Sequence, residues 1–526
     1  MPRRRSRRDK RKPVPLALTH ADIERLLDEI ETAALGGTET QVAVLSERLW
    51  QARVRLPELL TRRLIEGRTR TPGLAFDLLV GFARPDRLSG HLRRIADNRG
   101  VPDIVRFGAQ RRAGWPEWTD NRHRLFFLET LADSDQTLLE AIRQGSSTWP
   151  PDGQVLEEVL GYLAALPVER RRAVVGRAID ELESEATWLL RALLHADDSA
   201  TQLLALKALL GARGRGALGP TERLARTTQD AQLRVEATAA ARRLRLEPVD
   251  RGDAVAASPL PTFQRALVSQ VDGDGGQVIL VMRQWTEVVW LFADVFHNDH
   301  WGVKQVFGSC RATPDQVEEM LEDLAEGDIH LVEVDLAAVR GILDAAIGVN
   351  AASRHAVPPA FELWEPLLHD SYPPRDEPVI LPELDDAPYA GRQDLVRSSA
   401  ELAAHPWFDS WRFDPARTSA AMIRTPPPAR AGQLTSRQFG SLIERLVDGP
   451  TRDVFRARLR RQAWLLDKDG DEQARELALA TAAHLATAGP AELAGQPFLR
   501  AIVERSLLDV IEAVRGRDDN GGAGEV

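Results

Sequence analysis

Apolar side chains recur at helical spacing through the first half of the chain. In the segment 19–35, four apolar residues at steps of three and four mark one helix face: Ile23, Leu26, Leu27 and Ile30. Thr19 precedes this face as a predicted N-cap, and Asp22 follows three residues later, as in a capping box. Similar segments follow, separated by short loops that carry Gly, Pro or Asp. Since short loops join antiparallel neighbours, we predict tandem antiparallel helix pairs over residues 19–246.

The pattern changes after a linker at residues 247–262. "GGQVILVMRQW" and "EVVWLFADVF" are rich in the aliphatic and aromatic residues typical of strands, and "GVKQVFGS" continues in the same manner. They predict two or three antiparallel strands, with a hairpin at 277–297. Helices are expected near 314–325, where Thr313 is the predicted N-cap, and near 335–350, with a third, short helix in "PPAFELWEPLL".

The last third of the chain divides by composition. Residues 371–435 are rich in proline and predict an irregular connector, apart from the helix-like aromatic patch "HPWFDSWRF". Residues 436–515 return to amphipathic helical segments, and we predict C-terminal helical repeats of tandem antiparallel helix pairs there. We expect the basic tail, residues 1–18, and the C-terminal tail, residues 516–526, to be disordered.

Two of the helical segments look like copies of each other. "DDSATQLLALKALLGA" and "TQDAQLRVEATAAARRL" place Asp198 and Asp230 in equivalent positions, 32 residues apart, each before a helix with alanine on one side. A period of about 30 residues built from paired helices indicates a stacked solenoid. These residues resemble HEAT-like repeats of the phycobilisome-lyase type. The resemblance implies N-terminal HEAT-like repeats over residues 19–250.

The middle segment resembles a second, small bacterial domain of unassigned function, over residues 263–370. The likeness rests on strands that end in "GVK" (Gly302 to Lys304), followed by "LAAVRGILDAAIGVN" and "PPAFELWEPLL". The related pattern reads "D…C…GVKD", whereas this chain has His300 at the cysteine and Gln305 at the last acid. The expected fold is therefore mainly α: an α-solenoid of HEAT-like helical hairpins with a small inserted α+β module, as in bacterial HEAT-like-repeat proteins.

Charge is distributed unevenly along the chain. Residues 1–12 hold eight Lys or Arg and one Asp, a charge of +7, so the total of −10 leaves −17 on the rest. Such an acidic body is a poor phosphate binder, and only residues 1–12 are expected to contact nucleic acid, weakly. The single cysteine, Cys310, excludes an internal disulfide and a cysteine-based zinc cage, and fits a cytoplasmic location. No apolar run reaches the length of a membrane helix, so no membrane contact is expected.

One stretch, "FADVFHNDHWGVK", carries candidate metal ligands. His297, Asp299 and His300 resemble part of the "HxHxDH" loop of metallo-β-lactamase-like hydrolases, in which imidazoles and a carboxylate hold a metal that activates water. Val295, however, occupies the position of the first histidine. The alternative interpretation is a polar turn between two strands, with Asn298 and Asp299 as turn residues. We favour the turn, and predict no metal site and no cofactor.

Other short motifs have simpler structural interpretations. "GRGALG" (Gly214, Gly216 and Gly219) follows a helix rather than the strand that a dinucleotide site needs, and is interpreted as a loop. "DKDGDE" lacks the spacing of a calcium loop and predicts a turn between helices, with Asp471 as N-cap. Five tryptophans are interpreted as structural rather than as a stacking platform: Trp115, Trp118, Trp149, Trp407 and Trp411.

These observations favour a non-enzymatic protein-binding scaffold or adaptor, because solenoids present extended binding surfaces. No catalytic or cofactor-binding residue is assigned, and the partner protein is not identified. Two alternatives stay open. One is a metal-dependent hydrolase that uses His297, Asp299 and His300. The other is a nucleic-acid-associated accessory protein that binds through its basic N-terminal tail.

Overall fold

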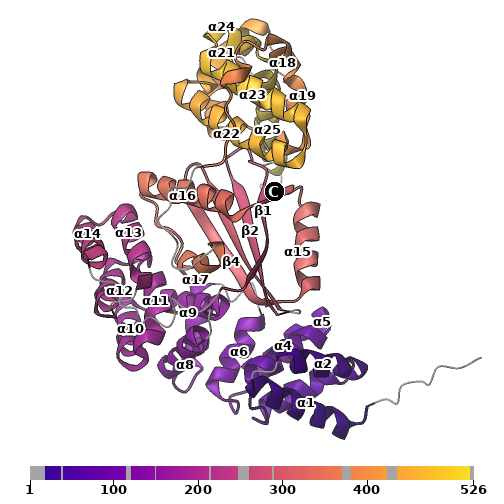
Figure 1. Ribbon diagram of the computed structural model, residues 1–526, viewed down its shortest axis with the longest axis vertical. Coiled ribbons are helices and arrows are strands. Elements are labelled where there is room, and N and C mark those ends of the chain that lie inside the picture. The colour runs from indigo at the N-terminus through magenta and orange to yellow at the C-terminus, as the bar shows by residue number, and fades with distance from the viewer. Residues whose placement is uncertain are drawn as a thin grey trace, which may run out of the picture. The chain divides into compact units, whose positions relative to one another are not determined.

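The computed structural model describes residues 18–36, 39–113, 120–147, 150–212, 215–246, 260–286, 289–369, 381–422 and 435–521. In these residues the chain is mainly helical, with one five-stranded antiparallel sheet near its middle (Figure 1). The chain forms two compact units. Unit 1 consists of Met1–Gln144 and Glu158–Leu182, and unit 2 of Gly145–Glu157 and Glu183–Val526. The predicted mainly helical fold with a small α+β module is confirmed at this level.

Unit 1 is helical throughout its described residues. Its elements are α1 (His20–Leu35), α2 (Glu39–Leu49), η1 (Trp50–Ala52), α3 (Leu56–Ile65), α4 (Pro72–Phe82), α5 (Pro85–Ala96), α6 (Asp103–Ala113), α7 (Asn121–Glu129), α10 (Val168–Leu182) and parts of α8 (Ser134–Ser146) and α9 (Gly153–Ala165). The predicted capping box is confirmed, since the Thr19 hydroxyl accepts from the Asp22 amide and the Asp22 carboxylate accepts from the Thr19 amide at 3.1 Å. The predicted apolar face of α1 is buried in the core of this unit.

After Gly145–Glu157, unit 2 continues from Glu183 with two helix pairs. Their elements are η3 (Glu183–Ala186), α11 (Thr187–Leu193), α12 (Ser199–Ala212), η4 (Arg215–Ala217), α13 (Leu218–Thr227) and α14 (Ala231–Leu246). The equivalence of the two aspartates holds in structure. Asp198 precedes α12, and its carboxylate accepts from the Thr201 amide in the first turn of that helix. Asp230 precedes α14, and its carboxylate accepts from the Leu233 amide in the same way. The sequence repeat therefore reflects two similarly capped helices.

The sheet has the strand order β4-β3-β2-β1-β5, and all its pairs are antiparallel. The strands are β1 (Thr262–Ser269), β2 (Gln277–Thr286), β3 (Val289–Asn298), β4 (Gly302–Ala312) and β5 (Leu331–Val334). The predicted hairpin at 277–297 is confirmed as β2 and β3. The sequence did not predict β1, part of which had been assigned to the linker, or the four-residue β5.

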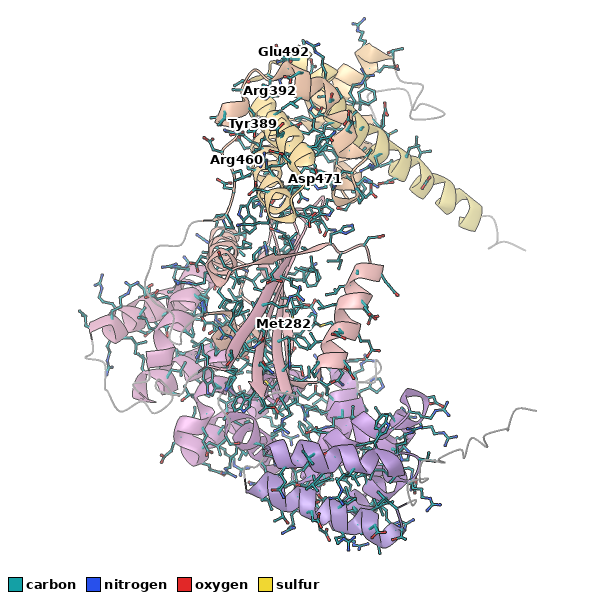
Figure 2. The ribbon with its side chains drawn as sticks, turned by 45° about the vertical axis from the view of Figure 1, so that its right-hand side comes forward. Met282, Tyr389, Arg392, Arg460, Asp471 and Glu492 are labelled. Atoms are coloured by element: carbon teal, nitrogen blue, oxygen red, sulfur yellow. The ribbon has the colours of Figure 1, made fainter. Side chains whose placement is uncertain are left out.

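Helices cover both faces of the sheet (Figure 1). α15 (Pro314–Glu326) packs on one face, where Val317 joins a core with Leu280 and Met282, the latter labelled in Figure 2. α16 (Leu336–Ser353), α17 (Phe361–Trp364) and η6 (Glu365–Leu368) pack on the other face and on β4. The predicted helices at 314–325 and 335–350 are confirmed, as is Thr313 as the N-cap of α15.

The C-terminal part of unit 2 is again helical. Its elements are η7 (Ala387–Tyr389), α18 (Gln393–Ser398), α19 (Ala400–Ala403), η8 (Pro406–Phe408), α20 (Pro415–Met422), α21 (Ser436–Leu446), α22 (Gly449–Asp469), α23 (Glu472–Thr487), α24 (Pro490–Gly495) and α25 (Pro497–Gly521). The predicted irregular connector at 371–435 was wrong for residues 387–403 and 415–422, which form short helices, and α18 packs on α23. In the predicted helix-like patch "HPWFDSWRF", Phe408 and Trp411 are buried against Phe498. Helix α25 also runs into the segment 516–526, which had been predicted to be disordered.

By length and composition, α16 is the one helix in the described residues that could cross a membrane. It packs against the sheet through a stripe of apolar residues at helical spacing: Leu336, Val339, Ile342, Leu343 and Ala346. These contacts are those of a core helix of the α+β module.

Candidate functional site

The "HNDH" stretch is the turn between β3 and β4. The Asn298 side-chain oxygen accepts from the backbone amides of His300 at 3.1 Å and Trp301 at 2.8 Å. Gly302 then starts β4 with a φ of +73°. The predicted polar turn between two strands is therefore present, and its chemistry is that of an Asx turn closed by a glycine.

The three candidate metal ligands have separate environments. His297 is buried at the end of β3, Asp299 is bound by two arginines, and His300 is exposed. Within the described residues, no group of three His, Cys, Asp or Glu side chains is arranged to hold a metal ion. The turn geometry thus does not bring His297, Asp299 and His300 to one point.

Asp299 instead anchors the turn to helix α22. One carboxylate oxygen lies 2.7 Å from Arg458 Nε, and the other lies 2.6 Å from an Arg461 Nη atom. The side chains of Arg458 and Arg461 are only 5% and 10% exposed. Burial alone would raise the pKa of Asp299, but Arg461 and Arg458 outweigh it and lower that pKa. The carboxylate is therefore held ionised between two arginines.

Two further features hold the β3–β4 turn close to α22. Arg458 also donates to the carbonyl oxygen of Gly273 in the β1–β2 turn. Gly275 has a φ of +74°, and a Cβ there would lie 2.1 Å from a carboxylate oxygen of Asp299. His297 stays neutral beside this cluster, since burial, reinforced by the positive charge of Arg461, lowers its pKa to about 3. The ion pairs of Asp299 therefore attach the β1–β2 and β3–β4 turns to helix α22.

The "GVK" motif has a structural explanation. A Cβ on Gly302 would lie 2.2 Å from the carbonyl oxygen of Ala346 in α16, so only glycine allows this approach. The side-chain amide of Asn350 then bonds both backbone groups of Val303: its oxygen accepts from Val303 N at 2.7 Å, and its nitrogen donates to Val303 O at 3.1 Å. Asn350 therefore takes the place of a neighbouring strand at the edge of β4.

A second buried charge cluster joins the helix pairs to α17 and η6. Arg223 of α13 bonds Glu362 at 2.6 and 2.8 Å and Glu365 at 2.8 Å. Arg191 of α11 bonds Glu365 at 2.6 Å, and His195 Nε2 lies 2.9 Å from Glu362. Burial would raise the pKa of each glutamate, but Arg223 above all outweighs it and lowers both. Two arginines and two glutamates thus balance in charge inside unit 2.

Neither the glutamates of the second cluster nor the arginines that bind them were identified from the sequence. Glu362 and Glu365 stand three residues apart inside the apolar stretch "FELWEPLL", and acids in such a stretch signal buried ion pairs. Their arginine partners lie 139 to 174 residues earlier, so no local pattern could identify them.

A third buried acid has no partner. Asp294 of β3 is 2% exposed, and its Oδ1 atom has no hydrogen-bond partner. Burial raises the pKa of this carboxyl to about 7. The strand register places Leu280 and Phe307 opposite Asp294, while Phe292 and Phe296 flank it on the same face.

This face of the sheet is only partly covered. Helix α15 packs over Leu280, Met282 and Phe292. Phe296 and Phe307 remain 37% and 36% exposed. The buried Asp294 therefore lies between the core under α15 and two partly exposed phenylalanines. We call Asp294, Phe296 and Phe307 the β3–β4 patch.

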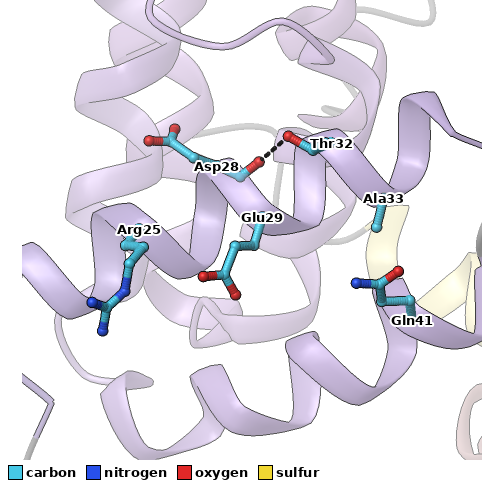
Figure 3. Close-up of a pocket in the computed structure, with 6 residues that line it drawn as sticks. All are labelled: Arg25, Asp28, Glu29, Thr32, Ala33 and Gln41. Carbon is cyan, nitrogen blue, oxygen red and sulfur yellow. Dashed lines mark hydrogen bonds between the residues drawn. The ribbon is translucent and has the colours of Figure 1, made fainter.

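The described surface of unit 1 has an open hollow of about 440 Å³ on α1 and α2 (Figure 3). It is lined by Arg25, Asp28, Glu29, Thr32, Ala33 and Gln41. The Thr32 hydroxyl donates to the Asp28 carbonyl, and the Asp28 carboxylate is bound by Arg63 at 2.8 Å. Thr32 and Asp28 are thus engaged within unit 1, and we assign the hollow no ligand.

The remaining sequence motifs are structural or lie outside the described residues. Asp471 caps α23 by accepting from Ala474 N at 2.9 Å, as predicted. Gly216 and Gly219 lie in η4 and α13, and Trp407 and Trp411 are buried. Gly214, Trp115, Trp118, Trp149 and residues 1–12 lie outside the described residues.

Comparisons of the chain with protein-family models, curated proteins and solved structures found no significant match.

Proposed function

We propose that the protein is a non-enzymatic adaptor that binds a partner protein, built on a HEAT-like helical solenoid with an inserted α+β module. The observation that carries this proposal is the β3–β4 patch, where two phenylalanines stand partly exposed on a sheet face whose other half is covered by α15. Aromatic side chains, phenylalanine included, are enriched in protein interfaces. The 32-residue offset between the caps of α12 and α14 supports the solenoid.

The buried ion pairs support a rigid role for unit 2. The Arg223 cluster connects helix pairs to the segment after the sheet, and the Asp299 cluster connects the sheet to α22. Both fix elements that are far apart in the sequence, as a scaffold requires. No observation favours the hydrolase alternative, since its three residues do not converge. The nucleic-acid alternative rests on residues 1–12 and remains a prediction, as does the cytoplasmic location.

The test is affinity capture with a patch variant. Tagged wild-type protein and a Phe296→Ser/Phe307→Ser variant are used to capture proteins from host lysate, and the captured proteins are quantified by mass spectrometry. We expect a defined partner to be lost with the variant. Val235→Ser/Leu508→Ser is the matched control, because both residues are exposed apolar side chains on helices of unit 2. Identical capture by all three proteins would refute a role for the patch.

A further inference from the structure

Among the buried acids in the described residues, Asp294 alone lacks a hydrogen-bond donor. Glu31 accepts from Thr69 at 2.6 Å, Asp386 is held by Arg456 at 2.7 Å, and Glu362 and Glu365 share the arginine cluster. A buried carboxyl without a partner costs free energy, and this cost rises further if the group is ionised. The fold satisfies every other such group, so Asp294 is an exception that invites a donor from outside the chain.

Helix α15, beside the patch, breaks the usual rules for helix charges. Six acids lie at helical spacing on its outward side, and it has no Lys or Arg: Asp315, Glu318, Glu319, Glu322, Asp323 and Glu326. All six are exposed, and no ion pair joins them to another side chain in the part of the chain that the structure describes. Like charges three or four residues apart repel, and acids near a helix C-terminus oppose the macrodipole. Asp315 in the first turn suits the helix dipole, but the later acids disfavour the helix, and no cation of the described residues pairs with them.

The two features lie on the same layer of unit 2. The inward side of α15 packs on the sheet face that carries the β3–β4 patch, and its acids form the outward side and flanks. A ligand on the patch would meet two phenylalanine rings that lie next to a buried carboxyl group, and a carboxylate-lined wall. This combination fits a cation attached to an apolar body.

We propose that the β3–β4 patch and the acidic side of α15 bind a segment of the partner protein that combines lysine or arginine with apolar side chains. The inference rests on the proposed adaptor function and deepens it. Apolar side chains of the segment pack on Phe296 and Phe307, one cation donates to Asp294 once these rings have moved aside, and others lie along α15. A phosphate-rich ligand such as nucleic acid is repelled by the same carboxylates.

The experiment uses three labelled synthetic peptides as probes, with the full chain and fluorescence anisotropy. The first is basic and apolar (KFKLRFKL), the second is basic without apolar side chains (KGKSRGKS), and the third is acidic and apolar (EFELEFEL). We expect only the first to bind tightly. Asp294→Asn should weaken its binding by roughly thirtyfold or more, the effect of removing one partner from a buried charged pair.

A second variant tests α15 without altering the core. Glu319→Gln/Glu322→Gln should weaken binding of the first peptide by about threefold to tenfold, as expected for two exposed ion pairs. Glu236→Gln/Glu444→Gln is the matched control, since it removes the same charge from exposed acids elsewhere in unit 2 and should leave binding unchanged. Equal binding of the first two peptides, or equal effects of the two double variants, would overturn the proposal.

The outcomes separate this inference from the adaptor function. If Phe296→Ser/Phe307→Ser loses the captured partner while Asp294→Asn and Glu319→Gln/Glu322→Gln bind the basic apolar peptide like wild type, the adaptor function stands and the cationic partner is wrong. If the peptide binds as expected but no captured protein depends on the patch, the surface is correct and the adaptor function fails.

Discussion

Replacement of Asp299 by asparagine tests whether the ion pairs of Asp299 hold the β3–β4 turn against helix α22. The substitution keeps the shape of the side chain and removes its charge. Arg458 and Arg461 are then left with their guanidinium groups almost fully buried and without a counter-ion. Removing one partner of a buried ion pair typically costs about 3–5 kcal/mol. The side chain of Asp299 is itself 21% exposed, so solvent compensates in part and we expect about 2–4 kcal/mol.

The assay must report locally, because the chain has two compact units and a single melting curve would mix them. Hydrogen exchange with mass spectrometry measures the opening free energy of peptides from α22 and from the turns that contact it. A loss of 2–4 kcal/mol corresponds to exchange that is about thirtyfold to a thousandfold faster. Peptides from unit 1 provide the internal reference and should exchange as in wild type.

Asp394→Asn is the control for this prediction. Asp394 also forms a short pair with an arginine, Arg392, at 2.8 Å, but both side chains are well exposed. Exposed pairs contribute little, so exchange should not change. If Asp299→Asn also leaves hydrogen exchange in α22 unchanged, the Asp299 carboxylate does not hold the β3–β4 turn against α22, and the reasoning is refuted.

The pH dependence follows from the sign of the shift. The folded pKa of Asp299 lies below its usual value, so its contribution is fully present above the unfolded value of about 3.9. The contribution is lost as the pH falls through the folded pKa. The difference in stability between wild type and Asp299→Asn should therefore be constant at neutral pH and shrink in acid below about pH 4.

Three further predictions follow from individual residues. Gly302→Ala should destabilise the α+β module by about 1–3 kcal/mol in exchange measurements, because alanine is strained at a positive φ and its Cβ meets α16. The control is Gly348→Ala, at an open position of α16, which should be neutral or slightly stabilising. Equal effects of the two substitutions would contradict this account. A chain that starts at Pro13 should lose the weak, salt-dependent DNA binding expected of residues 1–12, and equal DNA binding by both chains would assign that affinity elsewhere. Dialysed wild-type protein should hold no stoichiometric zinc, manganese or iron, and a metal that disappears in His297→Ala/His300→Ala would restore the hydrolase alternative.

Local patterns in the sequence predicted most of the helices. The capping box at Thr19, the N-caps at Thr313 and Asp471, and the apolar face of α1 all follow from short-range chemistry, and all are present. The β2–β3 hairpin was equally readable, because its strands are apolar and rich in β-branched residues. The misses have the opposite character. β5 is only four residues long, and α18 and α19, with six and four residues, are too short to show a helical period.

The candidate site divides in the same way. The turn at Asn298 is local and was predicted, but the role of Asp299 depends on arginines about 160 residues later, which sequence spacing cannot connect. The "GVK" motif is visible in the sequence, but only the approach of α16 explains why its first residue must be glycine. Long-range partners of charged residues are therefore the part of this site that requires coordinates.

Acids within apolar segments could have been recognised in the sequence as buried groups that need a partner. Glu362, Glu365 and Asp294 each stand among large apolar neighbours, where an ionisable group is costly unless it is paired. Such a residue predicts a partner without naming it. The fold supplies arginines for the two glutamates and none for Asp294. The same physical rule therefore explains two of the three within the chain, and for the third it directs attention to a donor that a bound partner would bring.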